Sequence, residues 1–261
     1  EMIKNLELSP QMHEKILNHC VKRNIKFLST PFDIKSLNLL VNQFGVDTIK
    51  ISSGYIFAGE EKNYYEMDIP DSITTYGKTQ AAAEFYIQKT SLNYLVYRCC
   101  RLYGRGIVPT RPTWFENLQR RIAKNKSLGM DDFVSTGFLD VYYLGMILKM
   151  NFDKGVTNRL FQVSSNDVCT MYGFAKKYAD IFKVPADRFS KNRWLFPLNA
   201  TQTSTKVGDE TFFHLDTENI EGFLNIELPS ITESLEFTYN LYHGSQKMRD
   251  NEKGGDSIKF I

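Results

Sequence analysis

The sequence lacks the features that mark membrane proteins, secreted proteins and nucleic-acid-binding proteins. It has no run of about 18 apolar residues and no leader with a charged, an apolar and a small-residue part. We therefore expect a cytoplasmic protein with no membrane partner. Its formal net charge of +2 is spread along 261 residues, whereas nucleic-acid binding needs a concentrated basic face. We expect no nucleic-acid partner.

Cysteine is also scarce. The four cysteines lack any Cys-x-x-Cys spacing, so we expect reduced, buried thiols and no metal site; they are Cys20, Cys99, Cys100 and Cys169.

The remaining composition, with 42% hydrophobic and 24% charged residues, is that of a globular protein with one large or two small domains. Strand-like and helical patterns alternate, which predicts an α/β fold. A smaller mixed lobe is expected at about 105–135 and beyond 185. From Ser245 the chain is polar and contains Gly254-Gly255, so we expect a flexible tail over 245–261.

The first fifty residues predict a helix, a strand, a second helix and a second strand. Ser9-Pro10 is a helix entry, because serine can cap the helix and proline suits its first turn. A strand at 25–29, a helix from Asp33 to Gly45 and a strand at 46–52 follow. The first helix should bury an apolar face, formed by Met12, Ile16, Leu17, Cys20 and Val21.

Three stretches of this segment, in order, are Leu8 to Pro10, Phe27 to Asp33 and Ile49 to Gly54. They resemble pieces of the barrel of sialic acid synthase, which condenses phosphoenolpyruvate with an N-acetylated amino sugar. Residues 1–54 are interpreted as a βαβ fragment of that enzyme. The resemblance implies that Thr30, Lys50 and Ser53 line a phosphoenolpyruvate site, although the acidic residue expected after Ser53-Gly54 is Tyr55. About two strands of the barrel are present, and two strands cannot close it.

A second resemblance begins at Ser52 and continues to about residue 244. It rests on Ser52 to Gly59, Tyr65 to Pro70, Tyr76 to Glu84, Tyr97 to Gly104 and Phe138 to Val141. These motifs resemble the extended short-chain dehydrogenase/reductases, in particular dTDP-4-dehydrorhamnose reductase. The resemblance implies the C-terminal part of a reductase: a partial Rossmann-like parallel sheet with a smaller C-terminal substrate lobe.

The resemblance also implies catalytic roles for Ser53 and Tyr76. In such enzymes a carbonyl receives hydride from NAD(P)H, a tyrosine supplies the proton, and a Ser or Thr hydroxyl polarises the same oxygen. Because tyrosine has a pKa of about 10 in water, the family uses a lysine four residues later to favour its ionised form. Here that residue is Gln80, which can hydrogen-bond a cofactor ribose but carries no charge. Lys78 is the second candidate for cofactor binding, but it lies about 200° around the helix from the tyrosine and cannot simply take over the role of the missing lysine.

Binding of NAD(P), the implied cofactor, is in doubt for a second reason. Dinucleotide sites of this family need a glycine-rich turn that leads into a helix. No Gly-x-x-Gly-x-x-Gly occurs, and Gly104-Arg105-Gly106 follows a late strand and is interpreted as a loop.

Arginines follow a predicted buried strand at 92–97. We expect Arg101, Arg105 and Arg111 to be candidates for binding the diphosphate of a nucleotide sugar. The alternative is that these arginines form a solvated basic surface without a ligand. Further elements are predicted as helices at 114–124, which carries Arg120 and Arg121, at 140–148 and at 171–182, and as a strand at 160–164.

The leading hypothesis is an impaired nucleotide-sugar reductase or epimerase of bacterial surface-glycan biosynthesis. One alternative is a non-catalytic fused or truncated product that binds a nucleotide sugar or a partner, and a third is condensation of phosphoenolpyruvate. A homodimer is left open. We predict that Val46 to Ser53 pairs in parallel with the strand at 92–97 or with that at 25–29.

Overall fold

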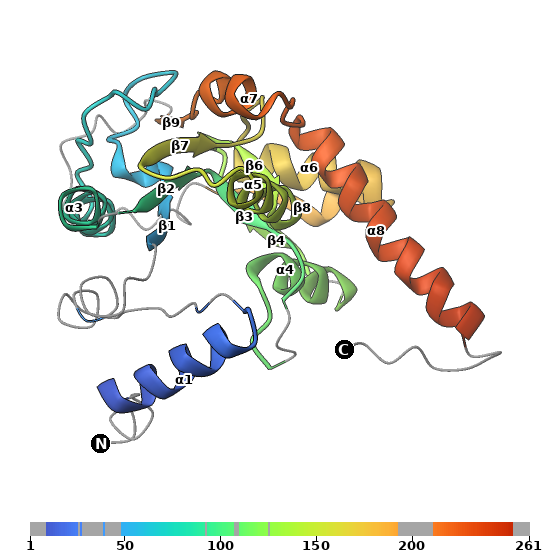
Figure 1. Ribbon diagram of the computed structural model, residues 1–261. Coiled ribbons are helices and arrows are strands. Elements are labelled where there is room, and N and C mark those ends of the chain that lie inside the picture. Colours follow the sequence, from blue (N-terminus) through green and yellow to red (C-terminus); the bar gives the residue numbers. More distant parts are fainter. Residues whose placement is uncertain are drawn as a thin grey trace.

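A three-stranded parallel sheet lies at the centre of the molecule (Figure 1). The computed structural model describes residues 9–25, 27, 39, 48–91, 93–106, 110–124, 126–192 and 211–252, with side chains as far as Tyr242. The strand order is β1-β2-β7, with bounds Thr48–Ser53, Tyr94–Cys99 and Arg159–Val163. β1 pairs in parallel with β2, which confirms the predicted pairing of Val46 to Ser53 with the strand at 92–97.

Helices cover the two faces of this sheet. The helix α3 (Thr75–Thr90) contacts β1 and β2 on one face, where the buried Glu84 pairs with the buried Arg98 of β2. On the other face, a buried apolar cluster joins β2 and β7 to α5 (Val141–Asp153) and α7 (Glu218–Leu224). This arrangement is the α/β class that the alternating pattern predicts.

Beside the sheet and its covering helices lies a lobe with its own aromatic core. It contains the helices α4 (Trp114–Ala123) and α6 (Met171–Phe182) and the pair of strands β4 (Leu128–Met130) and β8 (Phe189–Lys191). Phe115 and Phe174 are fully buried within it. The remaining elements are β3 (Arg101–Tyr103), β5 (Val134–Thr136), β6 (Phe138–Asp140), β9 (Thr211–Phe213), η3 (Gly54–Ile56), η4 (Ala186–Arg188) and α8 (Ile231–Glu252).

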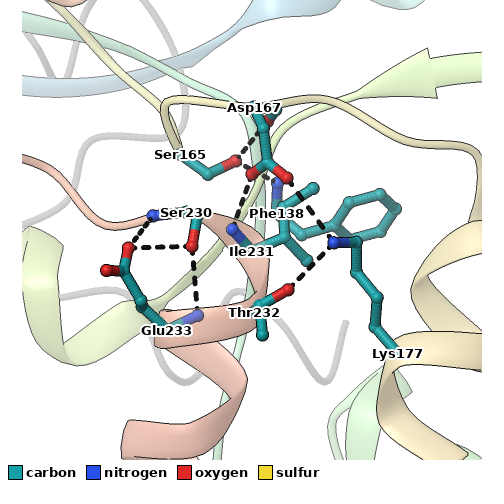
Figure 2. A network of polar contacts seen from close by, with 8 residues as sticks. All are labelled: Phe138, Ser165, Asp167, Lys177, Ser230, Ile231, Thr232 and Glu233. Carbon is teal, nitrogen blue, oxygen red and sulfur yellow. Dashed lines mark hydrogen bonds and ion pairs between the residues drawn. The ribbon is translucent and has the colours of Figure 1, made fainter. Parts of the chain in front are cut away.

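A polar network fastens α8 to the loop after β7 and to α6 (Figure 2). One carboxylate oxygen of Asp167 accepts a hydrogen bond from the Ile231 backbone N–H at 2.6 Å. The other lies 3.7 Å from Nζ of Lys177, which also donates to the Thr232 hydroxyl. The first turn of α8 is therefore held by side chains from two other segments, which satisfies backbone groups that a helix end leaves unpaired.

The N-terminal helix α1 (Pro10–Lys22) begins as predicted, with the Ser9 hydroxyl accepting from the Met12 backbone N–H. The predicted burial of its apolar face is wrong, since none of its residues is buried. Met12 and Ile16 are exposed, and Figure 1 shows α1 set apart from the sheet. An amphipathic pattern predicts a helix, but burial also needs a surface to cover it.

Several predicted features fall on or near undescribed segments. The strand at 25–29 and the helix at 33–45 lie largely outside the described residues. The helix α8 extends to Glu252, into the segment 245–261 predicted as a tail, of which residues 253–261 are not described. No helix in the described ranges has the length and apolar character needed to cross a bilayer.

Candidate functional site

The candidate site lies beyond the carboxyl ends of β1 and β2, where parallel α/β sheets place their ligands. Ser53 and Cys99 are register partners at these ends. Tyr55 and Arg101 each follow two residues later, and Nη2 of Arg101 donates to the Tyr55 hydroxyl at 3.1 Å. The parallel register thus brings together two side chains that lie far apart in the sequence.

These two side chains line a cavity of about 330 Å³. Most of the other lining residues belong to α4 and to the segment from β4 to β6. The lining residues are Tyr55, Arg101, Trp114, Asn117, Leu118, Arg121, Gly129, Met130, Asp131, Val134, Thr136, Phe138 and Met171. A cavity of this size between two layers, mainly apolar with a few polar groups, suits a small-molecule ligand.

The charges in the cavity are unevenly placed. Arg101 is partly buried, and its guanidinium lies 6.0 Å from the ring centre of Trp114 and 5.8 Å from that of Phe138. Arg121 is exposed on the third turn of α4. Asp131 is buried, and its Oδ2 accepts from the backbone N–H groups of Phe133 and Val134.

Ser53, one of the predicted catalytic residues, is partly exposed at the end of β1, whereas Ser52 is buried. Its Oγ accepts from the backbone N–H of Tyr55 at 3.2 Å. Its hydroxyl therefore lies beside the backbone of a cavity-lining residue. Of these two adjacent serines, Ser53 is the one open to a ligand.

Tyr76, the second predicted catalytic residue, is the second residue of α3 and is 55% exposed. The helix begins at Thr74, whose hydroxyl accepts from the Gly77 backbone N–H at 2.9 Å. A Cβ at position 77 would lie 2.0 Å from the Tyr55 carbonyl oxygen. Gly77 therefore allows the start of α3 to pack directly on the chain after β1, although neither Tyr76 nor Ser53 lines the cavity.

Gln80 lies one turn after Tyr76 and contacts Lys50 of β1. Nζ of Lys50 donates to Oε1 of Gln80 at 2.5 Å. Burial lowers the pKa of Lys50, and the nearby charge of Glu84 acts in the opposite direction. An ammonium group is therefore present beside Gln80, but it comes from the strand.

Of the predicted site residues that the structure describes, only Arg101 lines the cavity. Lys78 is exposed. The guanidinium of Arg105 lies 5.8 Å from the ring centre of Tyr242, and Arg111 is exposed; neither lines the cavity. Thr30 lies outside the described residues.

The described residues do not fit a complete dinucleotide site. Gln80 offers a hydrogen-bonding amide, but no glycine-rich turn precedes a helix start next to it, and Lys50 already occupies its Oε1. Within the same ranges, no three His, Cys, Asp or Glu side chains are grouped as metal ligands. The four cysteines are free thiols as predicted; Cys99 and Cys100 are buried, whereas Cys20 and Cys169 are partly exposed.

Sequence reasoning missed most of the cavity wall, including Trp114, Met130, Asp131 and Phe138. It interpreted Tyr55 only as a replaced carboxylate. The usable signal was the parallel register: Tyr55 and Arg101 each come two residues after the paired Ser53 and Cys99, at the same edge of the sheet.

The family model described as RmlD substrate binding domain matches residues 34–243. Methionine adenosyltransferase 2 subunit beta from Bos taurus is 30% identical over 149 residues, which are 54% of this chain and 44% of that protein. The N,N'-diacetyllegionaminic acid synthase of Campylobacter jejuni is 46% identical over 56 residues, 22% of this chain and 16% of that enzyme. The chain thus spans less than half the length of these curated relatives.

A solved structure of dTDP-4-dehydrorhamnose reductase from Bacillus anthracis in complex with NADP has a similar fold. Its TM-score is 0.64 at 17% identity, over 78% of this chain and 69% of that one. At this identity the likeness shows a Rossmann-like reductase and epimerase fold.

Proposed function

The chain belongs to the RmlD substrate-binding domain family, and from that premise we propose that it binds a nucleotide sugar in the cavity between the sheet and α4. The diphosphate would lie against Arg121, and the sugar would extend toward Tyr55 and Ser53. The setting that we propose is cytoplasmic biosynthesis of bacterial surface glycans.

The observation that carries this proposal is the composition of the cavity wall. It combines two arginines with Trp114, Met130 and Phe138. Arginine matches phosphate oxygens through paired N–H groups, and aromatic rings offer flat apolar surface to a base or sugar. A nucleotide sugar carries both kinds of group in one molecule.

We further propose that the reductase chemistry is impaired. Ser53 would hydrogen-bond the sugar carbonyl and Tyr76 would supply a proton, as the family pattern implies. Gln80 brings no charge of its own to this pair, and the Lys50 ammonium is engaged by Gln80 Oε1. The same bond leaves Lys50 little freedom to bind phosphoenolpyruvate, the role that the synthase resemblance would give it.

Calorimetric titration with UDP-sugars and dTDP-sugars tests the binding proposal. Arg121→Met should weaken nucleotide-sugar binding roughly tenfold or more, because a charged hydrogen bond contributes about 1.5–3 kcal/mol. Arg120→Met is the matched control, since this neighbouring exposed arginine does not line the cavity. Equal affinities for the two variants would contradict the placement of the diphosphate, and no binding by the unmodified protein would contradict the function.

Oxidation of NADPH in the presence of a 4-keto nucleotide sugar tests the proposed impairment. Turnover by the unmodified protein should lie well below the median of about 10 s⁻¹ for enzymes, and Gln80→Lys should raise it. A thermal shift with a nucleotide sugar but none with NADPH would favour the non-catalytic alternative. Turnover near the median would show that the site is intact.

A further inference from the structure

Arg101 is a partly buried cation that has no carboxylate partner in the described part of the chain. Its contacts are the Tyr55 hydroxyl and the faces of Trp114 and Phe138, and it takes part in none of the described ion pairs. A guanidinium withdrawn from water is stabilised most strongly by an anion. The Arg101 guanidinium is therefore a candidate anion-binding group in the cavity wall.

The Arg101 guanidinium lies beside Tyr55, two residues after Ser53 in the sequence. Arg101 lies over Trp114, the first residue of α4. Arg121 lies about two turns further along the same helix, roughly 10 Å away. Both arginines line the cavity, Arg101 beside the first residue of α4 and Arg121 beyond it on the same helix.

A diphosphate at Arg121 leaves Arg101 facing the sugar. We infer that the site selects a nucleotide sugar whose sugar ring carries a carboxylate, and that Arg101 binds that carboxylate. The inference rests on the proposed function and adds the class of sugar. Ser53 supports the direction, because a hydroxyl that polarises a carbonyl has to meet the sugar and not the diphosphate.

Tyr55 positions the arginine for this contact. It accepts a hydrogen bond from Nη2 of Arg101, and its ring packs edge-on against Phe213 with a centre distance of 4.8 Å. A guanidinium has five N–H donors, so others remain for a bidentate contact with a carboxylate. Asp131, the acidic residue of the cavity lining, is engaged through Oδ2 by two backbone N–H groups.

Calorimetric titration with UDP, UDP-glucose and UDP-glucuronate tests the inference. The two sugars differ only at C6, which is a hydroxymethyl group in glucose and a carboxylate in glucuronate. The unmodified protein should bind UDP-glucuronate roughly tenfold or more tightly than UDP-glucose, as expected for a charged hydrogen bond. Arg101→Met should remove this preference, because it should weaken the binding of UDP-glucuronate much more than the binding of UDP-glucose. Arg105→Met, a change just after the strand that carries Arg101 and outside the cavity lining, should keep the preference.

Tyr55→Phe provides a variant with almost unchanged volume. It should reduce the preference several-fold, because the guanidinium loses the hydroxyl that orients it. Equal binding of the two sugars by the unmodified protein overturns the inference and leaves the proposed function standing. Equal weakening of UDP, UDP-glucose and UDP-glucuronate by Arg101→Met overturns it as well, because Arg101 would then hold the diphosphate. Failure of the unmodified protein to bind any of the three overturns the inference, and failure to bind dTDP-sugars as well overturns the proposed function itself.

Discussion

The two sides of the cavity are built differently. The lobe side is packed around Phe115 and Phe174, both fully buried, and α4 starts with a reciprocal capping box between Thr113 and Glu116. On the sheet side, Tyr76 is 55% exposed, and so are Ile49 and Ile51 of β1, at 44% and 40%. The lobe, which carries Arg121, is therefore preorganised, whereas β1 and the start of α3, which carry Ser53 and Tyr76, are more open.

The difference in burial is largest between residues that are register partners across the three strands of the sheet. Ile51 is the register partner of Tyr97, which in turn pairs with Phe161. Tyr97 and Phe161 are buried under α5 and α7, but Ile51 is exposed. The apolar layer thus thins out at β1, the strand that carries Ser53. Binding can persist on the intact side even where the reductase residues are less well supported.

The largest expected effect comes from truncating matched aromatic residues on the two sides. Phe174→Ala should lower the free energy of unfolding by about 3–5 kcal/mol, because it leaves a cavity among the rings of the lobe. Tyr76→Ala removes an exposed ring and should stay within about 0.5 kcal/mol. Urea unfolding followed by circular dichroism measures both. If Tyr76→Ala lowered the free energy of unfolding as much as Phe174→Ala does, the two sides would not differ in packing.

How far the sequence predicts this molecule depends on whether local pattern or long-range pairing decides a feature. The helix predicted at Met171 to Phe182 has those bounds in the structure, because a helical period is a local signal. The pairing of β1 with β2 was also predictable, since short parallel strands need neighbours. The burial of α1 was not, because no local pattern names the surface that covers a helix.

The candidate site shows the same division. Arg101, Arg105 and Arg111 have equal standing as sequence, yet Arg101 alone among them lines the cavity. Strand register favours Arg101 as the cavity residue, because it comes two residues after Cys99, the partner of Ser53 in the sheet. The contact of Lys50 with Gln80 likewise joins positions that belong to two separate resemblances. Spacing along the chain alone predicts neither the place of Arg101 in the cavity nor the contact of Lys50 with Gln80.

A smaller effect is expected from the network that holds α8 against the lobe and the sheet (Figure 2). Asp167→Ala should cost about 1.5–3 kcal/mol of unfolding free energy, because it removes the acceptor of the Ile231 N–H and the partner of Lys177. Asp153→Ala is the control, since its exposed pair with Lys149 should contribute little. Thermal and urea unfolding report the difference. Equal losses for the two variants would show that the network adds no more stability than a surface ion pair.

The smallest effect concerns Lys50, on the open side. Because burial lowers the pKa of Lys50 below the usual 10.5, holding its ammonium in the folded protein opposes folding at neutral pH. This penalty is present below the folded-state pKa and disappears as the pH rises toward the unfolded value. Lys50→Met removes the penalty together with the hydrogen bond to Gln80. The half-buried position limits the net change to about 1 kcal/mol.

The sign of the pH dependence is the test for Lys50. Urea unfolding of the unmodified protein and of Lys50→Met at pH 7 and pH 10 should show the unmodified protein gaining relative stability at the higher pH. Lys78→Met, which removes an exposed lysine from the same region, should show no such trend. A relative loss for the unmodified protein at pH 10 would mean that the Lys50 ammonium stabilises the fold through Gln80 and Glu84. The open side would then be held by its charges, and the difference between the two sides of the cavity would be one of polarity and not of order.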